Sequence, residues 1–374
     1  MGLKTLAEIS RFYGGDPDYV IAGGGNTSFK DTSTLWIKAS GAPLGEISEA
    51  GFVAMDRAKL TGLWELALPG NSKDREDRVL AELMAARKPG EENKRPSVET
   101  LLHDLLPFTY VVHTHPSLVN GLTCSRNGEQ AVRELFGGAL WIPVSDPGFV
   151  LASAVREKLD EKRRNGEKAP DLIFLQNHGV FVGADTPEKI KTLYGEIMAV
   201  LNGAVKRRPD FGGPVSEYGG SAGAARTLGK LSGGSAVFSR NNEIAALTAS
   251  RAVFAPVSSA FTPDHIVYAG SDPLFIDGGK DIEAAWKDHT DRTGRPPKIA
   301  ALEGTGIFGL GGTEKNAALA LELFTDTMKV AAYAESFGGP RFMPEEKIAF
   351  INNWEAEQYR ARLVTGSLSE KWRF

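Results

Sequence analysis

Two histidines separated by one residue are the first side chains in this sequence whose types and spacing could do chemistry. They are His113 and His115, in the stretch "YVVHTHP". Side chains at i and i+2 of a strand point to the same face, whereas on a helix they diverge by about 200°, so the pair can share one ion only if the stretch is extended. The two valines before the pair favour a strand. A His-x-His pair on a strand is a candidate for part of a metal site.

A third imidazole is available from His178 in "QNHGV", a turn that follows a second apolar run. Three histidines with open coordination positions are typical of a catalytic zinc, because a structural zinc site is closed by a fourth protein ligand. The alternative is that the three side chains are separate core or surface histidines. Residue types and spacing leave both interpretations open.

Glu99 lies upstream of the histidine pair, in "RPSVETLLHDLL". Pro96 and Ser97 are typical of a helix start, and an acid in the first turn is favourable to the helix dipole. Beside a metal, the same carboxylate could instead act as a general acid/base. Both roles stay open at this point. His103, one helical turn after Glu99, is expected to be a structural partner rather than a ligand.

Alternating strands and helices must position these residues. The runs "DYVIAGGGNTSFKD" and "TLWIKASGAPL" place β-branched and aromatic residues between glycine-rich turns and predict paired strands. Helical periodicity covers residues 75–87 and 97–105, and "LIFLQNHGVFVG" predicts a strand, a turn and a strand. A helix then begins with Thr186 as its N-cap and Pro187 as its first residue. The pattern predicts a mixed α/β fold.

The length of 374 residues predicts two domains, because one hydrophobic core rarely grows so large. A stretch rich in Gly, Ser and Pro marks the boundary, so we expect a metal-binding domain at 1–206, a linker at 207–235 and a second domain at 236–374. In the second domain, "FTPDHIVYAGSDPLFI" and "KIAALEGTGIFGLGG" predict strands.

The second of these runs repeats the pattern of strand, glycine turn, strand and helix that surrounds His178. Thr305 stands in the place of that histidine. We therefore expect the second domain to be a degenerate copy of the first, without a metal of its own.

The charge balance excludes several classes of partner. A formal net charge of −4 offers no basic field for nucleic acid or for an anionic membrane. No segment is long and apolar enough to span a bilayer, and the start of the chain lacks the apolar run of a signal peptide. Cys124 is the only cysteine, which excludes an intrachain disulfide and a thiolate metal cluster. A cytoplasmic protein is expected.

Four stretches, in this order, resemble the class II aldolase/adducin superfamily: "GGGNTSFK", "LWIKASG", "RPSVETLLHDLLPFTYVVHTHP" and "LQNHGVF". The chain is most similar to the aldolase portion of the bifunctional rhamnulose-1-phosphate aldolase/alcohol dehydrogenase proteins, in which "FTPDHIVY" also has a counterpart. The resemblance implies a class II aldolase-like mixed sheet flanked by helices, followed by a degenerate domain of similar fold.

The resemblance also implies roles for individual residues. His113, His115 and His178 would be ligands of Zn²⁺ or another divalent transition metal, and Glu99 would be the acid/base that also occupies an open metal position when substrate is absent. A phosphate site is implied at two glycine-containing turns and at the serine before the glutamate, where turn amides converge. Its residues are Gly25, Asn26, Thr27, Ser40, Gly41 and Ser97. Val98 stands where simple aldolases of the family often have a second serine, so one hydroxyl donor is missing.

The implied reaction is zinc-dependent retro-aldol cleavage of a ketose 1-phosphate, similar to rhamnulose 1-phosphate, to dihydroxyacetone phosphate and an aldehyde such as lactaldehyde. A divalent ion stabilises the enediolate charge that cleavage leaves. Sugar-phosphate epimerases and dehydratases use the same ligands, and adducin-like interaction modules share the fold without the metal site, so they remain alternatives. A Schiff-base route through Lys38 is a weaker one.

A dehydrogenase is the other rival. Gly304, Gly306 and Gly309 have G-x-G-x-x-G spacing after a predicted strand, but only about forty residues follow the next helix, which is too few for a Rossmann domain. The resemblance also bears on assembly, since family aldolases are typically fourfold oligomers with active sites at subunit interfaces. We therefore expect a homo-oligomer that binds a sugar phosphate, and a dimer of such two-domain chains could imitate a tetramer.

Overall fold

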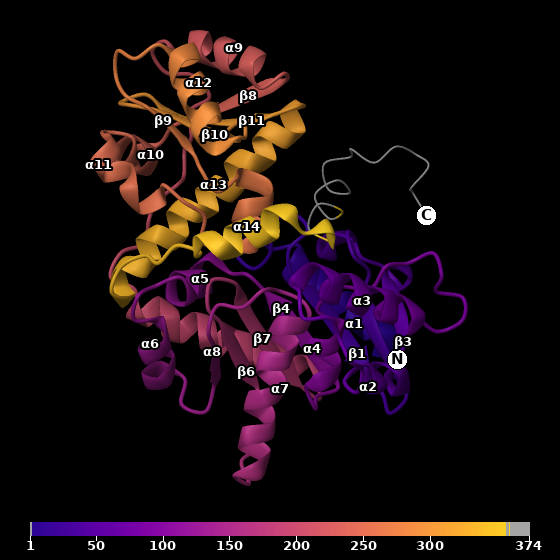
Figure 1. Cartoon of the computed structure of the whole chain (residues 1–374). Coiled ribbons are helices and arrows are strands. Elements are labelled where there is room, and N and C mark those ends of the chain that lie inside the picture. The colour runs from indigo at the N-terminus through magenta and orange to yellow at the C-terminus, as the bar shows by residue number, and fades with distance from the viewer. Residues whose placement is uncertain (1, 357–358, 360–374) are drawn as a thin grey trace. The chain divides into compact units, whose positions relative to one another are not determined.

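The structure is a computed structural model that describes residues 2–356 and 359 of the 374 in the chain. The chain divides into two compact units, whose elements are labelled in Figure 1. The first unit holds the residues up to Thr123, Gly128–Gly203 and the segment that begins at Asn353. The second unit holds Cys124–Asn127 and Ala204–Asn352. Each unit has its own sheet.

A seven-stranded mixed sheet forms the centre of the first unit, in the order β3-β2-β1-β4-β7-β6-β5. Its strands are β1 (Asn26–Lys30), β2 (Thr34–Lys38), β3 (Phe52–Asp56), β4 (Tyr110–Thr114), β5 (Leu140–Ile142), β6 (Leu172–Leu175) and β7 (Gly179–Ala184). Neighbouring strands are antiparallel except β5 and β6, which are parallel. The turn between β1 and β2 is closed by the carboxylate of Asp31, which accepts from the backbone N–H groups of Ser33 at 2.8 Å and Thr34 at 2.7 Å.

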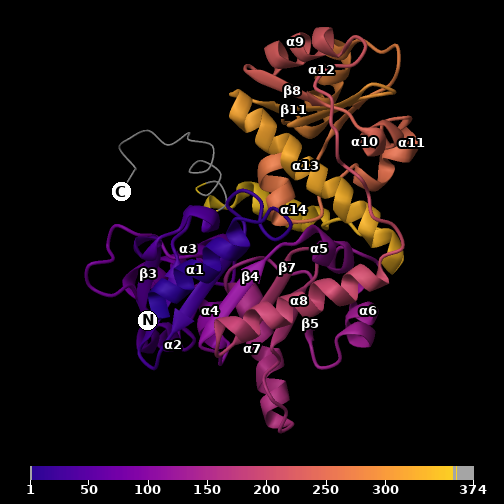
Figure 2. The same cartoon turned by 180° about the vertical axis from the view of Figure 1, so that it is seen from behind.

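Helices cover both faces of this sheet. They are α1 (Gly2–Gly14), α2 (Arg57–Leu63), α3 (Ser72–Ala85), α4 (Thr100–Leu105), α5 (Ser117–Thr123), α6 (Gly128–Leu135), α7 (Phe149–Arg164) and α8 (Pro187–Ala204), with short 3-10 turns η1 (Leu44–Glu46) and η2 (Glu49–Gly51). Apolar side chains of α2, α3, α4 and α7 form a core with Val111 of β4 and Phe181 of β7 on one face. The helices α1 and α8 lie over the other face (Figure 2). Because both faces are covered, β4 and β7 are buried along their whole length and read as apolar runs.

Capping residues set the limits of the helices near the histidines. The hydroxyl of Thr186 accepts from the N–H of Lys189 at 3.2 Å, and α8 begins at Pro187 as predicted. The helix predicted at 97–105 begins only at Thr100, because Ser97 lies in a preceding turn and its carbonyl accepts from the Thr100 N–H at 3.1 Å. Glu99 is therefore the N-cap residue of α4 rather than part of its first turn.

The second unit is built on a four-stranded sheet in the order β8-β11-β10-β9. Its strands are β8 (Ser235–Ser239), β9 (Leu274–Ile276), β10 (Ile299–Leu302) and β11 (Gly306–Gly311). Its helices are α9 (Ser221–Leu231), α10 (Asn242–Leu247), α11 (Arg251–Phe254), α12 (Ile282–Thr293), α13 (Glu314–Ala334) and α14 (Glu345–Asn353), with 3-10 turns η3 (Ala255–Val257) and η5 (Glu335–Phe337) and a π-helix η4 (His265–Ala269). Residues of α9, β8, β9, α12, β10 and β11 form its core.

The second sheet repeats part of the first. In the first unit β5 is parallel to β6, β6 is antiparallel to β7, and β7 is antiparallel to β4. The second unit has the same relations between β9 and β10, β10 and β11, and β11 and β8. The helices α7 and α12 connect the parallel strands, and α8 and α13 follow the last strand. Among the described residues, the second sheet contains no strands that correspond to β1, β2 and β3.

The compact units differ from the predicted domain limits in three places. One is Cys124–Asn127, which lies inside the predicted first domain but belongs to the second unit. The stretch predicted as a linker, 207–235, contains α9, whose Ala224 and Leu228 are buried in the core of the second unit. The described residues from Asn353 onward belong with the first unit, where a Cβ on Gly148 would lie 3.3 Å from the ring of Trp354. Composition could not show these features, because all three depend on contacts between distant parts of the chain. As limits of independently folding domains, the predicted bounds remain a prediction.

One predicted strand is wrong in part. In "FTPDHIVYAGSDPLFI" only Leu274–Ile276 is a strand, and His265–Ala269 is a π-helix. Thr262 starts this helical turn, since its hydroxyl and carbonyl accept from the N–H groups of His265 at 3.3 Å and Ile266 at 3.2 Å. Burial of His265 against Asp326, at 2.8 Å between Nε2 and Oδ2, then outweighs the strand preference of the β-branched residues.

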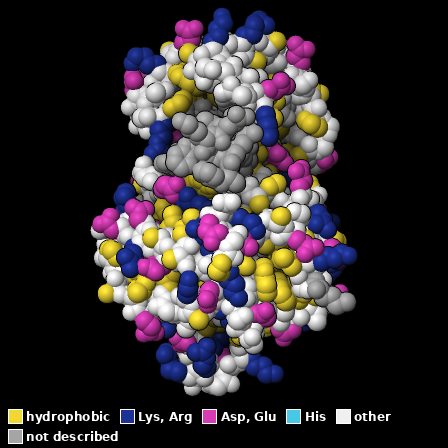
Figure 3. Space-filling model, turned by 90° about the vertical axis from the view of Figure 1, so that its right-hand side faces the viewer, with side chains coloured by type: hydrophobic (Ala, Val, Ile, Leu, Met, Phe, Trp, Pro, Cys, Tyr) yellow, Lys and Arg dark blue, Asp and Glu magenta, His cyan; other side chains and the backbone are white. Residues whose placement is uncertain are grey.

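Acidic and basic side chains are interspersed on the face of the molecule in Figure 3, so this face carries no broad area of one sign. Within residues 2–356 and 359, no helix combines the length and the hydropathy needed to cross a bilayer.

Candidate metal centre

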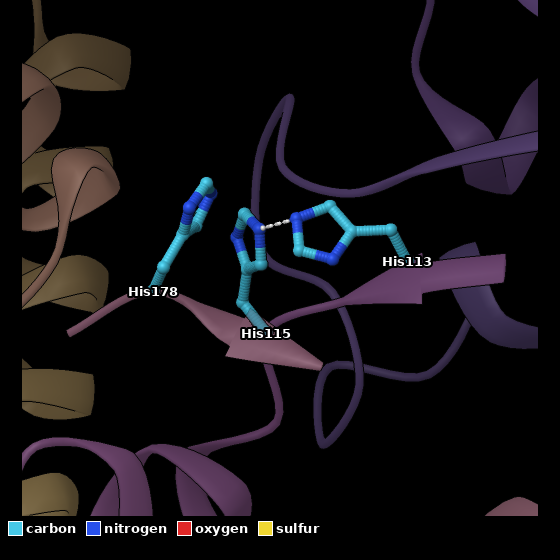
Figure 4. Close-up of side chains that lie close together, drawn as sticks. All are labelled: His113, His115 and His178. Atoms are coloured by element: carbon cyan, nitrogen blue, oxygen red, sulfur yellow. Dashed lines mark hydrogen bonds between the residues drawn. The ribbon is translucent and has the colours of Figure 1, made fainter. Parts of the chain in front are cut away.

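The three histidines singled out by their spacing meet at one end of the first sheet. His113 is on β4, His115 follows that strand, and His178 is in the turn between β6 and β7. Their ring nitrogens can be chosen so that all three lie within 4.8 Å of one another. Figure 4 shows the rings converging from the two neighbouring segments. Among the described residues, this is the single group of three or more His, Cys, Asp or Glu side chains with such spacing.

Strand pairing brings the third histidine to the first two. The register of β4 and β7 places Thr114 opposite Val180, so the turn before Gly179 lies beside the end of β4. Asn177 in this turn has a φ of 58°, a left-handed conformation that Asn tolerates. A Cβ on Gly179 would lie 2.5 Å from the carbonyl oxygen of Thr114 and 2.7 Å from Cδ2 of His115. Glycine is therefore required where the two segments meet.

Hydrogen bonds orient the ligand nitrogens. Nδ1 of His113 donates to the carbonyl oxygen of Val180 at 3.0 Å, which leaves Nε2 as the atom whose lone pair can bind a metal. That Nε2 lies 2.9 Å from Nε2 of His115, close to the separation of about 3.3 Å expected for two ligands of one tetrahedral zinc. The ring of His113 stacks on Phe181 with centroids 3.9 Å apart, and the N–H of His115 donates to the carbonyl of Tyr19 at 3.1 Å. The arrangement has the ligand type and the outer hydrogen bonds of a divalent-metal site.

The carboxylate of Glu99 completes the centre. Its Oε1 lies 3.7 Å from Nε2 of His113 and 3.8 Å from Nε2 of His178. This oxygen is buried and has no hydrogen-bond partner among the described residues. Although Glu99 is the N-cap residue of α4, its side chain makes no capping hydrogen bond. A buried carboxylate oxygen without a donor is costly unless a cation or a proton meets it, so the site fits a divalent ion.

The other oxygen of Glu99 is held by Asn26. Nδ2 of Asn26 donates to Oε2 of Glu99 at 2.5 Å and lies 3.4 Å from Oγ of Ser97. On the other side, Oδ1 of Asn26 pairs with Nε2 of His103, whose Nδ1 pairs with Ser28 at 2.8 Å. The sequence suggested Asn26 for phosphate binding, but its side chain is engaged with the carboxylate and the imidazole.

The remaining residues of the predicted phosphate site lie at two places. Gly25 has a φ of 66°, and a Cβ there would be 2.8 Å from the carbonyl oxygen of His113, so glycine is required at the start of β1. The hydroxyl of Thr27 faces α1, where it hydrogen-bonds Ser10 at 2.6 Å. Ser40 donates its N–H to the carbonyl of Arg95 at 2.8 Å, which sets the turn of Ser40 and Gly41 beside the segment that leads to Ser97.

Lys38 is a residue whose place near these turns the sequence did not reveal. It is buried at the end of β2, and its Nζ donates to the carbonyl of Ala42 at 2.9 Å and lies 3.5 Å from that of Gly23. The ammonium therefore ties the Ser40 turn to the glycine-rich turn before β1. In the sequence, the apolar neighbours of Lys38 suggested only a Schiff-base role. The approach of the two turns could not be predicted, because it depends on the fold.

A second buried lysine lies behind the centre. Nζ of Lys30 donates to the backbone carbonyl of His103 at 2.5 Å. The pKa of Lys30 is lowered to about 7, mainly by burial, which the carboxylate of Asp104 opposes and the guanidinium of Arg57 supports. Burial also lowers the pKa of the His103 imidazole well below its usual range, and His113 and Lys30 add to this effect. In both groups burial shifts the pKa toward the neutral form, because it penalises the charged one.

Comparison with known proteins places this centre in a family. Residues 4–201 match the family described as Class II Aldolase and Adducin N-terminal domain. A curated relative, the "Uncharacterized oxidoreductase YuxG" of Bacillus subtilis (strain 168), is 24% identical over 414 residues, which cover 97% of this chain and 58% of the relative. The chain thus spans less than two thirds of the length of this relative.

Solved structures also match about half of the chain. The N-terminal class II aldolase domain of a conserved protein from Thermoplasma acidophilum is 27% identical, with a TM-score of 0.46, over 53% of this chain and 91% of that one. L-fuculose-1-phosphate aldolase from Thermus thermophilus is 17% identical, with a TM-score of 0.33, over 53% of this chain and 90% of that one.

Proposed function

Because this chain belongs to the family of class II aldolases and adducin N-terminal domains, we propose that it is a metal-dependent aldolase acting on a sugar phosphate. The proposed reaction is retro-aldol cleavage of a ketose 1-phosphate, similar to rhamnulose 1-phosphate, to dihydroxyacetone phosphate and an aldehyde such as lactaldehyde. The observation that carries the proposal is the unpaired Oε1 of Glu99, buried within 4 Å of two imidazoles of a three-histidine cluster. An adducin-like interaction module would have no use for this arrangement.

His113, His115 and His178 would hold the metal, for which zinc fits the ligand set and another divalent transition metal is an alternative. When bound, the ion would supply positive charge against the enediolate that carbon–carbon cleavage leaves. Three protein ligands leave coordination positions open to substrate. The stacking of His113 on Phe181 and its bond to Val180 keep the ligand atom directed into the site.

Glu99 would deliver a proton to the enediolate carbon after cleavage, which balances the hydroxyl proton that the substrate loses as the aldehyde forms, and would remove the carbon-bound proton in the reverse direction. Its Oε2 is occupied by Asn26, so Oε1 is the oxygen that carries the proton. The position of Glu99 at the start of α4 keeps its backbone in place, since its carbonyl accepts from the N–H of His103 at 3.1 Å.

The substrate phosphate would bind where the two turns and Ser97 come together. The proposed donors are at Gly25, Asn26, Thr27, Ser40, Gly41 and Ser97. The side chains of Asn26 and Thr27 are already engaged, which favours Ser40, Gly41 and Ser97 as the main donors. Lys38, buried between the turns, would supply the positive charge that the net charge of −4 does not.

The glycines that suggested a dehydrogenase do not form a dinucleotide-binding motif in the structure. Gly304 is in the turn between β10 and β11, and Gly306 and Gly309 are on β11 itself. A dinucleotide-binding motif needs its glycines in the turn between a strand and a helix, where the pyrophosphate meets the helix N-terminus. A Cβ on Gly309 would lie 2.1 Å from the carbonyl oxygen of Ala317, so this glycine serves the packing of α13 on the sheet. Epimerase and dehydratase activities on the same centre remain alternatives.

A product assay separates these activities. Purified protein with measured metal content is given a panel of ketose 1-phosphates, and dihydroxyacetone phosphate, aldehyde and isomeric sugars are followed by NMR. We expect stoichiometric dihydroxyacetone phosphate and aldehyde, formed about a hundredfold or more slowly by Glu99→Gln and at an unchanged rate by Glu76→Gln, a matched change of a buried carboxylate on α3. An epimeric sugar without aldehyde, or loss of water from the substrate, would replace the aldolase proposal with one of its alternatives.

We extend the proposal to the assembly and location of the protein. Each chain contains two related sheet units. A dimer would therefore contain four units, the same number as the fourfold assemblies implied by the family resemblance. Native mass spectrometry should then show about twice the 40.2 kDa of one chain. A monomer with full activity would refute this part. The single cysteine fits the proposed cytoplasmic location.

A further inference from the structure

A row of four buried side chains runs from Glu99 away from the metal ligands. Asn26 bonds Glu99 at 2.5 Å, His103 bonds Asn26, and Ser28 bonds His103 at 2.8 Å. The ring of His103 has no exposed surface, so it cannot touch a substrate. The proposed function uses Glu99 and Asn26 and leaves His103 and Ser28 without a role in the chemistry.

The chemistry of the four groups fixes the direction of every bond in the row. An ionised carboxylate only accepts, so the amide nitrogen of Asn26 faces Glu99 and the amide oxygen faces His103. Nε2 of His103 must then carry the hydrogen, and Nδ1 must accept from the hydroxyl of Ser28. A neutral imidazole satisfies this pattern in one tautomer, and the lowered pKa of His103 agrees with a neutral ring.

The row determines which carboxylate oxygen faces the metal ligands. If Asn26 were free to flip its amide, its oxygen would meet Oε2 of Glu99, and the carboxylate would be repelled from its position. The N–H of His103 prevents this flip by requiring the amide oxygen on its own side. Glu99 therefore keeps Oε2 bonded and Oε1 open beside His113 and His178.

We infer that His103 is a positioning residue, which acts through Asn26 to hold the carboxylate of Glu99 with Oε1 toward the three-histidine centre. The inference rests on the proposed function, because it refines the acid/base role given to Glu99. The competing explanation is that His103 only fills space in the core, where it lies against Phe181 with ring centroids 5.2 Å apart. The two explanations differ in whether a change at residue 103 acts through Glu99.

A double-mutant cycle tests this difference. His103→Phe keeps the volume and removes both hydrogen bonds, whereas His103→Gln keeps a donor for Asn26. If His103 positions Glu99, His103→Phe lowers kcat by about ten- to a hundredfold with little change in KM, and His103→Gln recovers part of the loss. In the Glu99→Gln background, the same His103→Phe change costs less than about twofold, because the group it positions is gone. Equal losses in both backgrounds would overturn the inference.

A second readout does not depend on turnover. Co²⁺ added to the metal-free protein reports, through its visible absorption, on the groups around the ion. We expect the spectrum to differ between wild type and His103→Phe, and this difference to vanish when Glu99→Gln is present in both. His289→Gln, a change of another buried histidine on α12, is the matched control and should leave the spectrum unchanged.

The two proposals fail in distinguishable ways. Wild-type protein that binds no Co²⁺ would refute the metal centre and with it the proposed function. Bound Co²⁺ with the same spectrum in wild type and His103→Phe, both folded by circular dichroism, would leave the centre intact and overturn the positioning role.

Discussion

The first unit carries His178 in a turn that has a counterpart in the second unit. The two turns have a similar backbone conformation and differ in their side chains. Val180, the second residue of β7, lies opposite Thr114 on β4. Ile307, the second residue of β11, lies opposite Ser239 on β8 in the same way. Matching the two registers pairs the ligands with three other residues: His113, His115 and His178 correspond to Phe238, Arg240 and Thr305. The sequence repeat predicted Thr305, and strand pairing adds the other two.

The aromatic support of the first ligand is retained in the second unit. The ring of His113 stacks on Phe181 at 3.9 Å between centroids, and Phe238 lies against Phe308 at 4.9 Å. Phe181 and Phe308 are each the third residue of their strand. The second unit thus has similar aromatic packing at this position, with a ring that lacks nitrogen atoms in place of the imidazole.

A guanidinium takes the place of the second ligand. Nη1 of Arg240 donates to the carbonyl oxygens of Gly304 at 2.9 Å and Thr305 at 2.5 Å, and its Cζ lies 3.9 Å from the ring centroid of Tyr218. Gly304 has a φ of 66°, close to the 58° of Asn177 in the first turn. The same arrangement of strand and turn can therefore carry either a cluster of histidines that could bind a cation or a side chain that is itself a cation. Three side chains decide between them.

Removal of two ligands from the first unit should have the largest effect. In His113→Ala with His115→Ala, we expect the metal to be lost and cleavage to fall by at least about a thousandfold, because the ion contributes several kcal/mol to the transition state. Elemental analysis should find one ion per chain in wild type and none in this variant. The matched change in the second unit, Arg240→Ala, should leave one ion. Stoichiometric zinc in the double-alanine variant would show that the comparison assigns the ligands to the wrong place.

The acid/base should come next. Glu99→Gln is expected to keep the fold and the ion and to lower turnover by about a hundredfold or more, the usual scale for a positioned proton-transfer group. Glu76→Gln, a buried carboxylate on α3 that accepts from the N–H of Phe149 at 3.2 Å, controls for the loss of a buried charge. Near-normal turnover in Glu99→Gln would leave Glu99 with a structural role and make the two units more alike than proposed.

Lys30 on β1, a strand without counterpart in the described second unit, should make stability depend on pH. Its pKa is about 7 in the folded chain and ordinary when unfolded, so between pH 7 and about 10 the unfolded chain binds more protons. The free energy of unfolding should therefore rise with pH in this range, with a contribution from Lys30 of up to about 1.4 kcal/mol per pH unit. Lys30→Met should remove this contribution in urea unfolding at several pH values. The exposed Lys59→Met should not, and equal slopes for wild type and Lys30→Met would contradict the prediction.

The phosphate site should show the smallest effect. Ser40→Ala is expected to weaken competitive inhibition by inorganic phosphate by about threefold to tenfold, which corresponds to the usual net value of one hydrogen bond, about 0.5–1.5 kcal/mol. Ser153→Ala on α7, whose hydroxyl donates to the carbonyl of Phe149 at 2.8 Å, is a control away from the turns. An unchanged inhibition constant in Ser40→Ala would place the anion elsewhere.

Some features of the site follow from local sequence. Strand side chains alternate, so a His-x-His pair on an extended stretch directs both rings to one side wherever the strand packs. Asn177 and Gly179 around His178 are residues that a tight turn needs, and Thr186 with Pro187 starts a helix by its own capping chemistry. These features depend on residues close in sequence, which is why the three histidines could be singled out and the elements around them predicted.

Other features were decided by tertiary structure. The partners of Asn26 and Thr27 depend on which turns and helices approach them, and nothing within a few residues of either specifies that approach. The π-helix at His265 forms against the local strand preference because His265 is buried together with Asp326, which is 61 positions away in the sequence. Hydrogen bonds and burial across long sequence distances set these contacts, and the energies involved exceed local propensities of about 1 kcal/mol or less.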